Sequence, residues 1–215
     1  MEPNFWHQKW ESNSIAFHEQ STNRLLIDYF NKLSVSHNGR VFVPLCGKTR
    51  DIAWLLSKGY GVVGVELSEL AIEQLFADLG LEPVVSDVGP LKLYKAPDIE
   101  IFAGDFFDLS PEMLGSVEAV FDRAAFVALP PDLRLRYSKR LMELTSHAPQ
   151  LLITLEYDQA LMTGPPFSLR EDVVVHHYQS SYDLIPLAAL DVNAPLKGRV
   201  EAQEKAWLLC PLSST

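Results

Sequence analysis

Five short apolar runs, rich in β-branched residues, constrain the fold more than any other feature of the sequence. They are VFVPL at 41–45, GVVGVE at 61–66, IEIFAG at 99–104, VEAVFD at 117–122 and QLLITLEY at 150–157. Strands that helices cover on both faces are almost continuously apolar, whereas strands with one wet face alternate. Stretches of helical character separate the runs, at about 50–58, 68–79 and 132–146. We therefore predict an α/β fold with a doubly wound, mostly parallel sheet.

Both ends of the chain depart from this pattern. Residues 3–12 and 21–33 are predicted to be helical from the spacing of their apolar residues. Three later segments are predicted to be strands, the last two as an antiparallel pair that closes the sheet: VVVHHY at 173–178, SYDLIPLAAL at 181–190 and EKAWLLCPL at 204–212. No repeat or long linker divides the sequence, so we expect a single domain over residues 1–215.

The charge balance argues against a nucleic-acid partner. The formal net charge is −10, and nucleic-acid binding depends largely on Lys and Arg neutralising phosphates. No apolar run approaches the roughly 18 residues that cross a bilayer, and the start has no signal-peptide pattern, so we expect a cytoplasmic protein without a membrane partner. Cys46 and Cys210 form no CxxC motif, and we predict neither a metal site nor a redox pair. A monomer that binds small molecules is expected.

The letters Gly47-Lys48-Thr49 suggest a P-loop, but their spacing excludes one. A P-loop needs a glycine five positions before its Gly-Lys pair, and that position holds Phe42 inside a predicted strand. A dinucleotide fingerprint needs three glycines, and this turn has only Gly47. We therefore expect a ligand without a pyrophosphate, and we expect Lys48 and Thr49 to begin the next helix.

Ligands of open α/β sheets bind outside the carboxyl ends of the strands, where this sequence places several polar residues. Glu66 ends the second run, 19 positions after Gly47, and could accept hydrogen bonds from both ribose hydroxyls of an adenosine. Its alternative role is to stabilise the helix that follows through the macrodipole. Asp105 and Phe106 follow the third run and could contact adenine. The Asp105 carboxylate would accept a hydrogen bond from the exocyclic amine, and the Phe106 ring would cover the face of the base. Their alternative is a turn aspartate before a core aromatic.

An adenosine ligand without a pyrophosphate fits S-adenosylmethionine. Its sulfonium is cationic, and backbone groups of a turn with one glycine can hold its amino-acid tail. A protein that only binds such a ligand, without catalysing a reaction, would have the same residues at the strand ends.

Longer motifs resemble the thiopurine S-methyltransferase family, and bacterial members in particular. They are FWHQKWESNSIAFHEQ at 5–20, VFVPLCGKTRDIAWLLSKGYGVVGVELS at 41–68, GDFFDL at 104–109, FDRAAFVALPP at 121–131 and GPPFSL at 164–169. PLCGK and FDRAAFVAL, each after a predicted strand, are the specific ones. The resemblance implies the Rossmann-like, seven-stranded sheet of class I S-adenosylmethionine-dependent methyltransferases. It also implies that residues 1–37 form a helical lid within the single domain.

The resemblance further implies roles for individual residues. The implied contacts to S-adenosylmethionine come from Trp10, Leu45, Glu66 and Arg123, with Asp105 and Phe106 near the adenine. From the turn itself, Gly47 is also expected to contact the cofactor, through its backbone. Phe17 matches a position near the acceptor pocket, and with Trp10 it could close over the cofactor as a lid that excludes water. Arg123 is expected to orient the acceptor or stabilise its thiolate, and its alternative is a surface pair with Asp122. The match is less distinct beyond Leu169, so the rest of the acceptor pocket is not assigned.

The implied reaction is S-methylation of a small aromatic or heterocyclic thiol. Its thiolate attacks the methyl group in line, and aryl thiols are acidic enough that no dedicated base is required. The resemblance suggests selenium or tellurium species as further acceptors. An amine or hydroxyl acceptor is the alternative, and the base or metal ligand that oxygen requires would come from His18, His176 or His177. Adjacent histidines on a strand point to opposite faces, which makes the last two a poor metal site.

Overall fold

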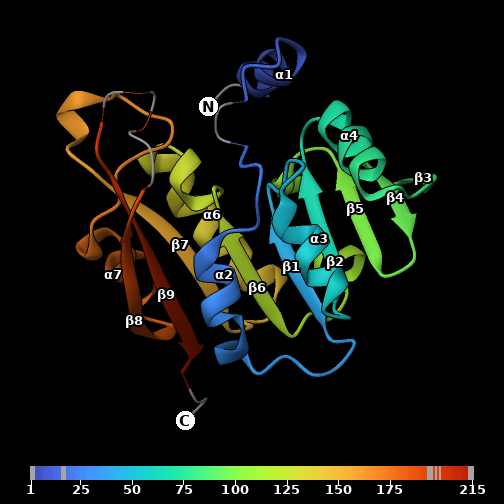
Figure 1. Ribbon diagram of the computed structural model, residues 1–215. Helices are drawn as coiled ribbons and strands as arrows, with labels where there is room; N and C mark the ends of the chain where they lie inside the picture. The colour runs from blue at the N-terminus through green and yellow to red at the C-terminus, as the bar shows by residue number, and fades with distance from the viewer. Residues whose placement is uncertain (1–2, 16–17, 193–195, 197, 199, 213–215) are drawn as a thin grey trace.

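The structure is a computed structural model that describes residues 3–15, 18–192, 196, 198 and 200–212. Nine strands of this part form one sheet in the order β3-β4-β5-β2-β1-β6-β7-β9-β8 (Figure 1). The five central strands are parallel: β5 (Ile99–Ala103), β2 (Gly61–Glu66), β1 (Arg40–Pro44), β6 (Ala119–Arg123) and β7 (Gln150–Glu156). They coincide with the five apolar runs, which confirms the predicted parallel core.

Antiparallel strands extend the sheet on both sides. β9 (Gln203–Pro211) pairs with β7, and β8 (Tyr182–Asp191) pairs with β9, as predicted. On the other side, β4 (Leu91–Ala96) pairs with β5 and β3 (Val84–Val88) pairs with β4. This hairpin raises the number of strands from the expected seven to nine. Its sequence gives no continuous apolar run, because β3 lies at the edge of the sheet and is mostly exposed.

The predicted strand at 173–178 is wrong, because this segment belongs to helix α7 (Glu171–Tyr178). An apolar run this short has no period that separates a strand from a buried helix. Val174 and Tyr178, four positions apart, are buried, as one face of a helix requires. His176 is exposed, and Nδ1 of His177 lies 3.1 Å from Oγ of Ser138, so the expectation that these histidines alternate along a strand is also wrong.

The helices predicted at 3–12, 21–33, 50–58, 68–79 and 132–146 are all present near those positions, and several short helices that were not predicted accompany them. At the N-terminus they are α1 (Pro3–Glu11), α2 (Arg24–Tyr29) and the 3-10 turn η1 (Phe30–Leu33). Farther along lie α3 (Arg50–Ser57), α4 (Glu69–Leu79), the short α5 (Pro111–Leu114), α6 (Pro131–Leu144) and the 3-10 turns η2 (Phe106–Asp108), η3 (Phe126–Ala128) and η4 (Gln159–Leu161). In the described part of the chain, no helix is long and apolar enough to span a membrane.

Helices cover both faces of the sheet, which divides the core into two main clusters. Phe42 of β1 packs on the face covered by α6 and α7, whereas its neighbours Val41 and Val43 pack on the face covered by α2, α3 and α4. The carboxyl ends of the five parallel strands lie on one side of the molecule, and α1 lies above them (Figure 1). The sequence predicts the ligand at these strand ends.

Candidate functional site

The turn after β1 reverses the chain at Leu45 and Gly47, both in the left-handed region with φ of 47° and 51°. Glycine adopts this conformation without strain, whereas a leucine there is unusual. Thr49 then caps α3, its hydroxyl accepting a hydrogen bond from the N–H of Asp51. Thr49 therefore begins the helix as predicted, whereas Lys48 lies in the turn before it.

Glu66, at the end of β2, lies directly beside this turn. Its carboxylate accepts the N–H of Gly47 at 2.8 Å and that of Ser68 at 2.9 Å. Burial raises the pKa of Glu66, and the N–H groups of Ser68, Gly47 and Leu67 counteract part of this rise. Ser68 caps α4 itself, so the helix does not depend on Glu66 for its cap. The second strand end is therefore joined to the glycine turn by a buried carboxylate.

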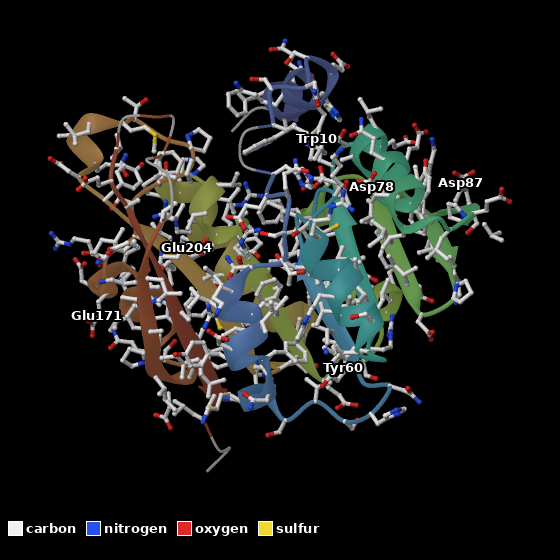
Figure 2. All side chains as sticks on the ribbon, in the orientation of Figure 1. Trp10, Tyr60, Asp78, Asp87, Glu171 and Glu204 are labelled. Carbon is white, nitrogen blue, oxygen red and sulfur yellow. The ribbon has the colours of Figure 1, made fainter. Side chains whose placement is uncertain are left out.

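Trp10 brings the N-terminal segment onto the same turn. It is buried, and a Cβ atom on Gly47 would lie 3.0 Å from its Cζ2 atom and 3.4 Å from its Cη2 atom. Figure 2 shows Trp10 below α1, toward the body of the molecule. The indole thus lies against the turn after β1, whereas Phe17 lies outside the described residues.

Asp105 and Phe106 follow β5 but have different environments. Asp105 is exposed and caps η2, accepting the N–H of Phe107 at 2.9 Å. Phe106 is buried, with its ring centroid 4.8 Å from that of Tyr137 and 5.4 Å from that of Phe107. The structure therefore places Asp105 on the surface, just beyond the carboxyl end of β5, and Phe106 in the core beneath it.

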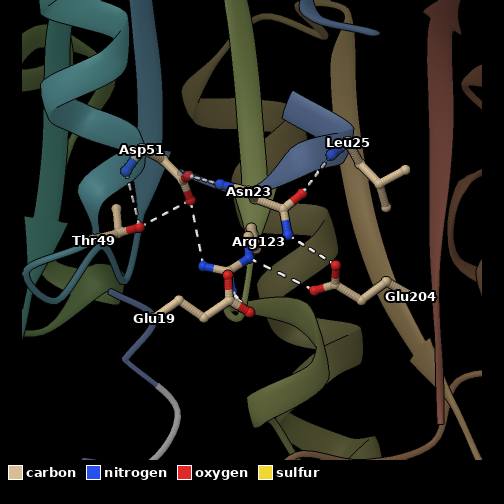
Figure 3. Close-up of polar contacts among 7 residues, drawn as sticks. All are labelled: Glu19, Asn23, Leu25, Thr49, Asp51, Arg123 and Glu204. Atoms are coloured by element: carbon tan, nitrogen blue, oxygen red, sulfur yellow. Dashed lines mark hydrogen bonds and ion pairs between the residues drawn. The ribbon is translucent and has the colours of Figure 1, made fainter. Parts of the chain in front are cut away.

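Arg123, at the end of β6, is surrounded by three carboxylates (Figure 3). Its Nη2 lies 2.5 Å from Oε1 of Glu19, its Nη1 3.3 Å from Oδ2 of Asp51, and its Nε 3.8 Å from Oε1 of Glu204. Burial disfavours the charged form, but Asp51, Glu19 and Glu204 outweigh it and raise the pKa of Arg123. The expected alternative, a surface pair with Asp122, is wrong.

Asn23 and Thr49 hold the carboxylates of this cluster in place. Asp51, only 1% exposed, accepts the backbone N–H of Asn23 at 2.8 Å and the hydroxyl of Thr49 at 2.9 Å. Asn23 also donates from Nδ2 to Oε2 of Glu204 at 2.8 Å. The start of α2, the start of α3, the end of β6 and strand β9 therefore meet at Arg123. Asn23, Asp51 and Glu204 were not predicted from the sequence, because each has an ordinary place at a helix start or in a strand.

Asp122 points into the core rather than toward Arg123. It is fully buried and accepts the N–H of Phe126 at 3.1 Å and the hydroxyl of Tyr137 at 2.7 Å. Burial raises its pKa from 3.8 to about 6. These bonds anchor the turn after Arg123, in which Ala124 has a φ of 67°. Within the described ranges, no group of three or more His, Cys, Asp or Glu side chains is arranged to hold a metal ion.

Comparison with known proteins identifies the relatives of this chain. The sequence model described as Thiopurine S-methyltransferase (TPMT) matches residues 1–209. The thiopurine S-methyltransferase of Xanthobacter autotrophicus is 50% identical over 97% of this chain and 99% of the relative. That of Teredinibacter turnerae is also 50% identical, over 97% of both chains.

Solved structures show the same fold at low sequence identity. The Burkholderia thailandensis 1,6-didemethyltoxoflavin-N1-methyltransferase, solved with S-adenosylhomocysteine, superposes with a TM-score of 0.66 at 15% identity, over 97% of this chain and 87% of that one. A TehB-like S-adenosylmethionine-dependent methyltransferase from Corynebacterium glutamicum gives 0.58 at 13% identity, over 98% of both chains. The fold is thus the Rossmann-like α/β fold of class I methyltransferases. The sequence matches add a narrower assignment: the chain belongs to the thiopurine S-methyltransferase family.

Proposed function

We propose that this protein transfers the methyl group of S-adenosylmethionine to the sulfur of a small aromatic or heterocyclic thiol. The observation that carries the cofactor assignment is the buried Glu66 carboxylate, 2.8 Å from the N–H of Gly47 in a turn with one glycine. Membership of the family supports the thiol as acceptor. When bound, the cofactor supplies a methyl group on a cationic sulfur.

The residues at the strand ends suit an adenosyl group. Each oxygen of Glu66 takes one backbone N–H, which leaves lone pairs for the two ribose hydroxyls. The backbone at Leu45 and Gly47 would contact the amino-acid tail, and Asp105 is exposed where an adenine amine would be accepted. The ring of Trp10 covers the turn, where it would exclude water and attract a sulfonium by a cation–π interaction.

The chain's own groups suffice for attack by a thiolate. An aryl thiol ionises readily, so the protein needs to align the sulfur and keep the pocket dry rather than to remove a proton. Arg123 keeps its charge at any working pH, and in this proposal it faces the acceptor sulfur. We further propose that the enzyme acts as a monomer in the cytoplasm, and light scattering of the purified chain checks the first of these.

The decisive experiment measures methyl transfer from labelled S-adenosylmethionine to a panel of acceptors. The panel contains aryl thiols, phenols, amines and selenite-derived anions at equal concentrations. We expect labelled thioethers from the thiols, with selenium anions as further acceptors. Preferential labelling of phenols or amines would contradict the proposal, and cofactor binding without any turnover would indicate a binding protein instead of an enzyme.

Replacing Gly47 by alanine is expected to weaken cofactor binding. The residue is left-handed, which disfavours any Cβ by about 1–2 kcal/mol, and the new methyl would press on Trp10 at 3.0 Å. Gly80→Ala is the matched control, because Gly80 is also left-handed, with a φ of 68°, but its Cβ would meet nothing within 4 Å. Both variants should lose thermal stability because of the left-handed backbone, and Gly47→Ala should lose more because of its contact with Trp10. Only Gly47→Ala should bind S-adenosylhomocysteine more weakly by calorimetry, and equal affinities would remove the turn from the site.

Arg123→Lys is expected to lower kcat/KM for a thiol by about tenfold or more, because an ammonium cannot replace a planar fork that contacts several groups at once. The lysine keeps the charge, so the comparison isolates geometry. Arg24→Lys is the control, since the pair of Arg24 with Asp28 lies on the surface. Steady-state kinetics with saturating cofactor measures the effect. Full activity of Arg123→Lys would exclude a role for the guanidinium in the acceptor site.

A further inference from the structure

The three carboxylates around Arg123 are not equivalent. Asp51 is 1% exposed and fixed by two other donors, the N–H of Asn23 and the hydroxyl of Thr49. Glu204 is 19% exposed and fixed by Nδ2 of Asn23. Glu19 is 44% exposed, and within the described part of the chain its carboxylate is held by Arg123. Two carboxylates are therefore built into the framework, and one can leave.

The guanidinium presents different edges to these groups. Asp51 contacts Nη1, and the buried Nε has no hydrogen-bond partner because Glu204 lies 3.8 Å away. The remaining Nη2 takes Glu19 at 2.5 Å. Asp51 thus sets the orientation of Arg123, while the exposed Glu19, which precedes α2, contacts the Nη2 edge of the fork (Figure 3).

Electrostatics makes the contact with Glu19 exchangeable. Burial raises the pKa of Glu19, Arg123 lowers it, and the nearby carboxylates of Glu204 and Asp51 raise it again. Three carboxylates share one guanidinium, so the two fixed ones repel the third. An anion that took the place of Glu19 at Nη2 would leave the number of charges around the guanidinium unchanged, whereas a neutral molecule in that place would remove one negative charge from beside it.

We propose that Glu19 occupies the edge of Arg123 that the acceptor anion uses, so that an acceptor binds there only by displacing this carboxylate. The inference rests on the proposed function, in which Arg123 faces the acceptor. A neutral molecule of the same shape has no charge with which to displace Glu19. Glu19 therefore makes the site selective for acceptors that bind as anions. It also lowers the apparent affinity for every acceptor, because an acceptor can bind only to the fraction of molecules in which Glu19 has left Arg123.

Glu19→Gln tests this inference, because glutamine keeps the size of the side chain and removes its charge. With 4-nitrothiophenol, an aryl thiol ionised at neutral pH, we expect KM to fall about fivefold, since removing the competing state raises the binding-competent fraction. Glu11→Gln is the matched control: it removes the same charge from an exposed residue of the same N-terminal segment. KM should be unchanged in this control, and both variants should keep the wild-type affinity for S-adenosylhomocysteine.

The other results have distinct meanings. An unchanged KM in active Glu19→Gln would overturn the inference, because Glu19 would then not compete with the acceptor. A raised KM would also overturn it, since the carboxylate would then help to position Arg123. Glu19→Asp, which retains the charge on a shorter side chain, should lower KM less than Glu19→Gln does. A wild-type protein that does not methylate any thiol would refute the proposed function itself. Wild-type activity is therefore measured before the variants, which keeps this result separate from the test of Glu19.

Discussion

Glu66→Ala is expected to weaken binding of S-adenosylmethionine by about 1–3 kcal/mol, or roughly five- to hundredfold in Kd. The change removes a buried carboxylate that would accept both ribose hydroxyls. It also leaves the N–H groups of Gly47 and Ser68 without their acceptor, so the two strand ends lose their link. The effect on affinity should therefore exceed that of any exposed acidic residue near the site.

Calorimetric titration with S-adenosylhomocysteine measures this effect. Glu69→Ala is the control, because Glu69 starts the adjacent helix but pairs at the surface with Lys92. Glu66→Gln adds a second comparison: it keeps the size and one carbonyl oxygen, and its loss of affinity should lie between those of wild type and Glu66→Ala. Isotherms of Glu66→Ala that match the wild type would refute the ribose role of this residue.

Asp122→Asn is expected to change how the stability of the protein depends on pH. Burial raises the pKa of Asp122 from 3.8 to about 6. Between these values the folded state binds more protons than the unfolded chain, so the free energy of unfolding falls as the pH rises through this window. A shift of about two units corresponds to at most about 3 kcal/mol. An asparagine does not titrate, so this part of the pH dependence should vanish.

Urea unfolding of both proteins from pH 4 to pH 7 checks this expectation. Other carboxylates also titrate, so the informative quantity is the difference between wild type and Asp122→Asn at each pH. Wild type should lose stability relative to the variant as the pH rises. Parallel curves for Asp122→Asn would contradict the raised pKa.

The parallel core could be predicted from the sequence because its signal is local. A strand buried on both faces has to be apolar along its length, so β1, β2, β5, β6 and β7 are visible without any partner. The hairpin of β3 and β4 is held by pairing at an edge, which exposed residues can also achieve, so it left no such signal. The segment at 173–178 shows the reverse case: it is apolar, but its length does not separate a helix from a strand.

The candidate site likewise has one part that could be predicted from the sequence and one that could not. The spacing of Gly47 and Glu66 follows from the order of neighbouring strands in such a sheet, so it could be read from the sequence. The cluster at Arg123 depends on contacts between distant segments: Asn23 bonds to Asp51, 28 positions away, and to Glu204, 181 positions away. A single sequence contains no local pattern for such pairs. The resemblance to a family identified Arg123 but not the carboxylates that hold it.

The bond between Asn23 and Glu204 has a consequence for the order in which the two halves of the site form. A ribosome makes the chain from its N-terminus, so Gly47, Glu66 and Asp105 are synthesised before the strands that follow them. Glu204 lies in β9, 99 positions after Asp105. The nascent chain therefore contains the residues proposed to bind the cofactor well before the surroundings of Arg123 can be completed.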